Sequence, residues 1–125
     1  MSKLGEIMTG EVLTASSDTP VADVAESMVK RRVGSVLVMQ SSLLVGIFTE
    51  RDVLRAAASG KDLSTSRVSE WMTKDPETVD PDVEAEDAAE LMLSRGFRHL
   101  PVLEGNDVVG IVSLRDVLST RIRRQ

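Results

Sequence analysis

Two stretches of this chain match each other: Gly46-Ile47-Phe48-Thr49-Glu50-Arg51-Asp52 and Gly110-Ile111-Val112-Ser113-Leu114-Arg115-Asp116, sixty-four positions apart (110 minus 46). In both copies an apolar run ends at a hydroxyl residue, and an aspartate follows three positions later. This order predicts a β-strand that runs into the N-terminus of a helix. Such a junction offers backbone N–H groups and the positive end of a helix dipole beside a carboxylate. Both copies are therefore candidate sites for a small polar ligand.

The match extends well beyond these stretches. Residues 6–54 align with residues 70–118 without a gap, and eighteen of the forty-nine positions are identical. Internal repetition indicates the architecture before local propensities do. The sequence predicts one module of residues 1–125, with repeat one at about 4–60 and repeat two at about 68–125. A lone unit of about 60 residues would have a marginal core, so we expect the two to pack together.

Each repeat shows the same order of predicted helices. Extended lead-ins are expected at Glu6-Ile7-Met8-Thr9 and Glu70-Trp71-Met72-Thr73, before helices that begin near Thr19-Pro20 and near Asp82. Helical spacing predicts one buried face on each helix, formed by Val21, Val24, Ala25, Met28 and Val29, and by Ala85, Ala88, Ala89, Met92 and Leu93. Basic residues at 30–32 and the pair Arg95-Gly96 are interpreted as C-terminal caps.

Two apolar runs follow in each repeat, at residues 36–39 and 43–48 and at residues 100–103 and 108–112. Their composition predicts paired strands, and the lack of alternation predicts a sheet covered on both faces. Gly46 and Gly110 predict a close approach by backbone or ligand, and Pro101 predicts a sheet edge because it has no N–H. Helices at about 50–59 and 114–121 complete the repeats. Residues 121–125 are interpreted as a solvated basic helix end, with anion binding as the alternative.

Composition excludes several classes of function. A net charge of −5 and a pI near 4.9 argue against nucleic-acid binding, and two Phe and one Trp provide no stacking platform for bases. The absence of Cys and the single His argue against a metal site. No apolar stretch is long enough for a membrane span, and no leader pattern is present, so we expect a cytoplasmic protein.

The chain resembles a tandem pair of cystathionine β-synthase (CBS) domains. The resemblance rests on the openings Ile7-Met8-Thr9 and Trp71-Met72-Thr73, the segment Phe97-Arg98-His99-Leu100-Pro101-Val102, and both Gly-x-x-Thr/Ser-x-x-Asp copies. It covers essentially the whole chain. It implies an α+β fold of two βαββα repeats related by a pseudo-twofold axis, with sheets covered by helices. It also implies a homodimer, and clefts between the repeats that bind adenosine-containing ligands.

The same resemblance implies two sets of ligand-binding residues. The first cleft would contain Thr49, Arg51, Asp52, Thr78, Val79, Arg98, His99, Leu100 and Pro101. The second cleft would contain Thr14, Ala15, Ser35, Val36, Ile111, Ser113, Arg115 and Asp116. The aspartates would accept hydrogen bonds from ribose, whereas Arg98 and His99 would attract phosphate in the first cleft only. The expected ligand is AMP, ADP or ATP, ahead of S-adenosylmethionine or NAD, and no catalytic cofactor is implied.

Plainer alternatives stand beside these interpretations. The Thr49-x-x-Asp52 and Ser113-x-x-Asp116 spacings also match capping boxes, which would stabilise the helices without any ligand. His99 has no nucleophile to pair with and is more simply a structural residue, so we expect no catalytic residues and no enzyme activity. Two functions remain open. One is a nucleotide-sensing regulatory module that signals to a protein partner of unknown identity, and the other is a ligand-free structural module that mediates oligomerisation.

Overall fold

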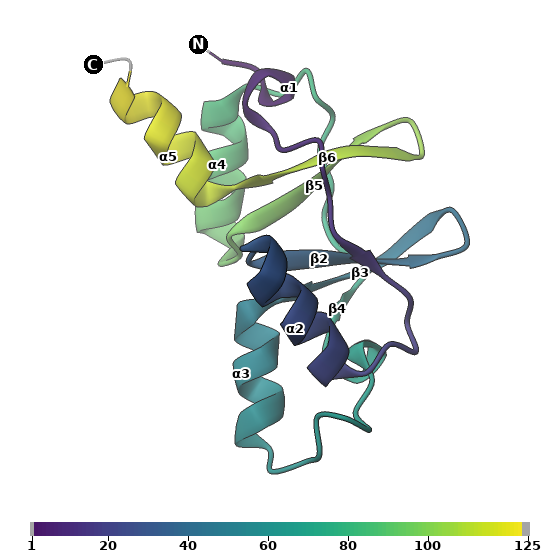
Figure 1. Cartoon of the computed structure of the whole chain (residues 1–125). Helices are drawn as coiled ribbons and strands as arrows, with labels where there is room; N and C mark the ends of the chain where they lie inside the picture. Colours follow the sequence, from purple (N-terminus) through teal and green to yellow (C-terminus); the bar gives the residue numbers. More distant parts are fainter. Residues whose placement is uncertain (1, 124–125) are drawn as a thin grey trace. The chain divides into compact units, whose positions relative to one another are not determined.

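The computed structural model describes residues 2–123, of which residues 120–123 are described as backbone only. The chain divides into two compact units (Figure 1). The first unit is Leu13–Pro76, and the second unit combines Met1–Val12 with Glu77–Gln125. Of the basic end expected at residues 121–125, residues 121–123 continue the last helix, whereas their side chains and residues 124–125 lie outside the described part.

The first unit contains a four-stranded sheet and two long helices. The strands are β1 (Thr14–Ala15), β2 (Ser35–Gln40), β3 (Leu43–Thr49) and β4 (Thr73–Lys74), in that spatial order. β1 pairs with β2 in parallel, and the other pairs are antiparallel. The helices α2 (Val21–Arg31) and α3 (Glu50–Ala58) lie side by side and contact the sheet, and the 3-10 turn η1 (Val68–Glu70) precedes β4 (Figure 1).

The second unit repeats this arrangement around a shorter sheet. The strands β5 (His99–Glu104) and β6 (Asp107–Ser113) form an antiparallel hairpin, packed with α4 (Ala85–Arg95) and α5 (Leu114–Arg123). The short helix α1 (Leu4–Ile7) contacts both β6 and α5. Single bridges at Val79↔Val102 and Thr9↔Ile111 stand where the first unit has β1 and β4. The predicted strands and second helices are thus confirmed to within about two residues.

The opening segment of each sequence repeat packs in the unit that holds the other repeat. Residues 4–9 lie in the second unit and residues 68–74 in the first, so Leu4 and Val68 are fully buried at equivalent places in the two cores. The prediction that both openings are extended is wrong at Glu6, Ile7 and Glu70, which belong to the helical turns at residues 4–7 and 68–70. These turns place the following methionine and threonine against the sheet edge.

The predicted close approach at the mid-strand glycines is confirmed, and its partner is the protein itself. A Cβ on Gly46 would lie 3.0 Å from Met72 Cγ and 3.1 Å from the Thr73 carbonyl oxygen. On Gly110 the corresponding distances, to Met8 Cγ and the Thr9 carbonyl oxygen, are both 2.9 Å. Both glycines therefore provide room for the opening segment that packs beside them.

The first helix of each repeat begins later than predicted. α2 begins at Val21 with Pro20 as N-cap, and the Thr19 hydroxyl pairs with Ser16 instead of capping the helix. The amides of Val21 and Ala22 donate to the carbonyls of Ser66 and Leu63, at 2.8 and 2.9 Å. α4 likewise begins at Ala85, whose amide donates to the Ser2 carbonyl at 2.8 Å. Backbone carbonyls distant in sequence thus satisfy N–H groups that we expected side chains to cap.

Helix burial follows the predicted pattern except at the last position of each set. Val21, Val24 and Met28 are buried, as are Ala85, Ala88 and Met92, whereas Ala25 and Ala89 are partly buried. Val29 and Leu93 are 78% and 69% exposed, so the prediction that they face the core is wrong. The glycine C-cap is confirmed at Gly96, which has φ 78°.

The sheet also follows its predictions. Four consecutive residues of β2, Ser35–Val38, are buried, which confirms that both faces of the strand are covered, because successive side chains point to opposite faces. In the first unit the Leu37 amide donates to the Leu13 carbonyl at 3.0 Å, next to β1. Pro101 occupies the equivalent place and has no N–H, so only one bridge forms there and β5 is an edge strand, as predicted.

Candidate ligand-binding site

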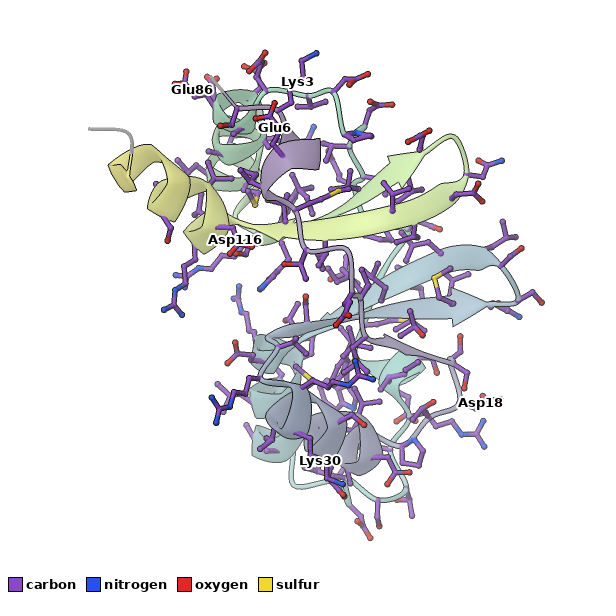
Figure 2. All side chains as sticks on the ribbon, turned by 45° about the horizontal axis from the view of Figure 1, so that its top comes forward. Lys3, Glu6, Asp18, Lys30, Glu86 and Asp116 are labelled. Carbon is purple, nitrogen blue, oxygen red and sulfur yellow. The ribbon has the colours of Figure 1, made fainter. Side chains whose placement is uncertain are left out.

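Both duplicated stretches form the expected strand-to-helix junction. β3 ends at Thr49 and α3 begins at the next residue, with the Asp52 carboxylate accepting the Thr49 amide at 2.9 Å. In the second unit the Asp116 carboxylate accepts the Ser113 amide at 3.3 Å, and the Ser113 hydroxyl accepts the Asp116 amide at 3.0 Å. Figure 2 shows Asp116 at the first turn of α5. The capping alternative is therefore confirmed at both junctions, and it fixes each carboxylate in place.

Asp52 also has a partner that the sequence reading missed. Arg55 Nη1 lies 2.9 Å from Asp52 Oδ1, and the Asp52 side chain is only 7% exposed. The guanidinium lies over the Trp71 ring, 5.6 Å from its centre, and its Nη1 donates to the Trp71 carbonyl at 3.5 Å. The three-residue spacing of Asp52 and Arg55 on one helix was the available signal. No sequence signal predicts the contact between Arg55 and Trp71, because this contact depends on how the opening segment packs.

A second contact distinguishes the two junctions. The Glu50 amide donates to the Gly34 carbonyl at 3.1 Å, and the Glu50 carboxylate occupies the space where residue 34 would carry a Cβ. In the second unit the equivalent amide, of Leu114, donates to the Arg98 carbonyl at 2.8 Å. The backbone arrangement is thus the same in both units, whereas the side chains differ in charge.

Both units contain residues from each of the two predicted sites. The first unit holds Thr14, Ala15, Ser35, Val36, Thr49, Arg51 and Asp52, and the second holds Thr78, Val79, Arg98, His99, Leu100, Pro101, Ile111, Ser113, Arg115 and Asp116. Within a unit, residues assigned to different clefts are cross-strand partners, namely Ser35 with Thr49 and His99 with Ser113. Each unit thus holds part of both predicted sites.

Burial decides what these residues can offer a ligand. Val36, Leu100 and Pro101 are buried, so they can present backbone groups more readily than side chains. Arg51, Arg98 and Arg115 are exposed and keep their guanidinium groups available. Among residues 2–123 no group of three or more acidic or histidine side chains could hold a metal ion. No helix in the described part of the chain is long and apolar enough to span a membrane.

Comparison with known proteins shows the family. The sequence profile of the CBS domain matches residues 4–59 and again residues 68–123. This chain therefore belongs to the CBS domain family and carries two copies of the domain, in an α+β fold.

Two relatives match over nearly the whole chain. An uncharacterized 17.7 kDa protein of Acidianus ambivalens is 41% identical, over 93% of this chain and 71% of its own length. The CBS domain-containing protein YhcV of Bacillus subtilis is 36% identical, over 94% of this chain and 84% of its own length.

The fold also matches a solved structure. The CBS domain pair of protein MJ0100, determined in complex with 5′-methylthioadenosine and S-adenosyl-L-methionine, superposes with a TM-score of 0.92. The two are 23% identical, and the match covers 100% of this chain and 99% of that one. At this identity the likeness shows the shared fold.

Proposed function

We propose that this protein is a regulatory module that binds adenosine-containing ligands without turning them over. The observation that carries the proposal is the duplicated junction, in which a carboxylate is held at a helix N-terminus beside a hydroxyl residue. A carboxylate in this position can accept hydrogen bonds from a ribose diol, and the neighbouring helix amides suit a phosphate. The adenosyl ligands of the MJ0100 pair support the same ligand class.

The proposed sites combine halves from both repeats, as the family resemblance implies. In the first site Asp52 holds the ribose and Arg98 attracts phosphate, and in the second site Asp116 holds the ribose beside Ser35. The preferred ligands are AMP, ADP or ATP in the first site. Occupancy would change the fit between repeats or between subunits, and a partner protein would respond to that change.

A thermal-shift screen tests this proposal directly. The protein is melted with saturating AMP, ADP, ATP, S-adenosylmethionine, 5′-methylthioadenosine or NAD, with guanosine monophosphate as the matched control. Ligand at about 100 times its dissociation constant adds roughly 2.7 kcal/mol to stability, which raises the melting temperature by several degrees. A shift with at least one adenosine compound and none with the guanosine control is the expected result. If none of these compounds changes the melting temperature, the proposal is rejected.

A second function, assembly of two copies through the helices, is favoured by a separate observation. The exposed large apolar residues on the helices recur at the repeat spacing: Val29 on α2 with Leu93 on α4, and Leu54 on α3 with Leu118 on α5. They are 78%, 69%, 71% and 45% exposed. Exposed apolar side chains at equivalent places of the two repeats suit a symmetric interface between two identical chains. We propose that a second copy of the chain covers them in a homodimer.

A further inference from the structure

The equivalent strand-to-helix junctions of the two units carry opposite charges, although the charged residues stand at different positions of the repeat. Gly34 and Glu50 of the first unit correspond to Arg98 and Leu114 of the second, at the common spacing of sixty-four. Each pair joins the start of a strand to the start of a helix through the same backbone hydrogen bond. The first unit therefore presents a carboxylate at this junction, whereas the second presents a guanidinium.

The position of the Glu50 carboxylate depends on the absence of a side chain at Gly34. A Cβ at residue 34 would overlap Glu50 Oε1 and would lie 3.3 Å from Cδ and 3.5 Å from Cγ. Any larger residue at 34 would therefore displace the carboxylate. Gly34 is followed directly by Ser35, which is buried and pairs across the sheet with Thr49, the residue before Glu50. The exposed carboxylate thus lies next to the part of the second proposed site that Ser35 contributes.

The remaining charges do not cancel this difference. Each duplicated motif contributes one exposed arginine, Arg51 to the first proposed site and Arg115 to the second. Glu50 stands between Thr49 and Arg51 of the first proposed site in the chain, but its carboxylate lies against Gly34, the neighbour of Ser35 in the second proposed site. The contrast that we consider is therefore between Arg98 in one site and Glu50 in the other. A carboxylate a few ångströms from a phosphate repels it, although exposure to solvent weakens the effect. An uncharged substituent would not be repelled, and a cationic one would be attracted.

We infer that Glu50 is a specificity-determining residue that disfavours phosphate in the second proposed site. That site takes an adenosine derivative with an uncharged or cationic 5′ substituent, such as a thioether or a sulfonium, whereas the site with Arg98 takes a phosphorylated one. This inference rests on the proposed function, because it assigns a ligand chemistry to each of the two proposed sites. Gly34 and Glu50 act together in this selection, because Gly34 leaves space for the carboxylate and Glu50 provides its negative charge.

The test compares AMP with 5′-methylthioadenosine in the wild type, Glu50→Gln and Glu90→Gln by titration calorimetry. Glu90→Gln removes the same charge from an exposed place on α4 and serves as the control. The second site is identified as the binding event that Asp116→Ala abolishes. At this site Glu50→Gln should tighten AMP binding by about threefold to tenfold and leave 5′-methylthioadenosine within about twofold. Glu50→Lys should increase the AMP effect further and weaken a sulfonium ligand.

Several results would overturn the inference. Unchanged AMP affinity in both Glu50 variants, or an equal change for both ligands, would show that Glu50 does not select by charge. The same AMP effect in Glu90→Gln would assign it to net charge alone. If the wild type binds neither compound, the proposed function itself fails and the inference falls with it. If both compounds bind and the ratio of their affinities is the same in the wild type and the Glu50 variants, only the inference fails.

Discussion

Arg55→Ala should lower the stability of the free protein and yet strengthen ligand binding at Asp52. A carboxylate offers about four lone-pair positions. Three bonds already reach Asp52: from the Thr49 amide at 2.9 Å, from the Thr49 hydroxyl at 3.4 Å and from Arg55 at 2.9 Å. A ribose diol needs two acceptor positions, so at least one existing bond must break. Releasing Arg55, whose side chain is 54% exposed, would free both acceptor positions on Asp52 Oδ1.

The size of both effects follows from these contacts. A partly exposed ion pair contributes about 0.2–1 kcal/mol, and the Trp71 contact adds about 0.5–1 kcal/mol. Removing both should cost the free protein about 1 kcal/mol, or roughly 4 °C in melting temperature for a chain of this length. Binding would no longer have to break the ion pair, so affinity should rise by about 1.4-fold to fivefold.

Two measurements on the same samples test this prediction. Calorimetric melting without ligand measures the loss of stability, and titration with AMP measures the affinity of the binding event that Asp52→Ala abolishes. Arg67→Ala is the matched control, because it removes an exposed arginine that pairs with Asp18 in the same unit. A purely structural role for Arg55 would lower stability and affinity together. That outcome, or an equal effect of Arg67→Ala, would refute the competition for Asp52.

Three further predictions concern packing, assembly and pH. Gly46→Ala should destabilise the protein by about 1–3 kcal/mol in denaturant melts, whereas Gly10→Ala, with nothing within 4 Å, should be neutral. Leu54→Glu should reduce the mass measured by light scattering to that of a monomer, while Leu43→Glu, 61% exposed on the hairpin, should not. Hydrogen bonds from Ser64 lower the pKa of Asp62 below its ordinary value of 3.8. The stabilisation that the Asp62 carboxylate provides is therefore present above pH 3.8 and is lost as the pH falls through the lowered pKa. Asp62→Asn should melt at a lower temperature than the wild type at neutral pH, and this difference in melting temperature should disappear in acid.

The features that the sequence predicted well are those that depend on neighbours in the chain. The ungapped repeat and the apolar runs located all four long strands and the helices that follow them. The spacing of Thr49 and Asp52 also predicted the capping box that the structure contains. These signals act over a few residues, so they can be read without knowing the rest of the fold.

The failures arise where distant segments meet. The α2 start was misplaced because carbonyls at residues 63 and 66 cap it, and no local pattern reports such a contact. Val29 fits the helical spacing of a core residue, but it lies in the last turn of α2 and is exposed. The contact of Arg55 with Trp71 spans sixteen residues and depends on how the opening segment packs. Periodicity records which residues share a face but not which segment covers that face.

We propose that the duplicated aspartates bind the ribose of an adenosine ligand. Titration calorimetry with AMP on the wild type, Asp52→Ala and Asp116→Ala measures what each aspartate contributes to binding. Losing two charge-assisted hydrogen bonds should cost about 3 kcal/mol or more, so Asp52→Ala should weaken the tighter event more than a hundredfold. Melting without ligand separates this from the cap, whose loss costs about 1 kcal/mol. Asp116→Ala should leave the tighter event intact. AMP binding that survives unchanged in both variants would contradict the claim.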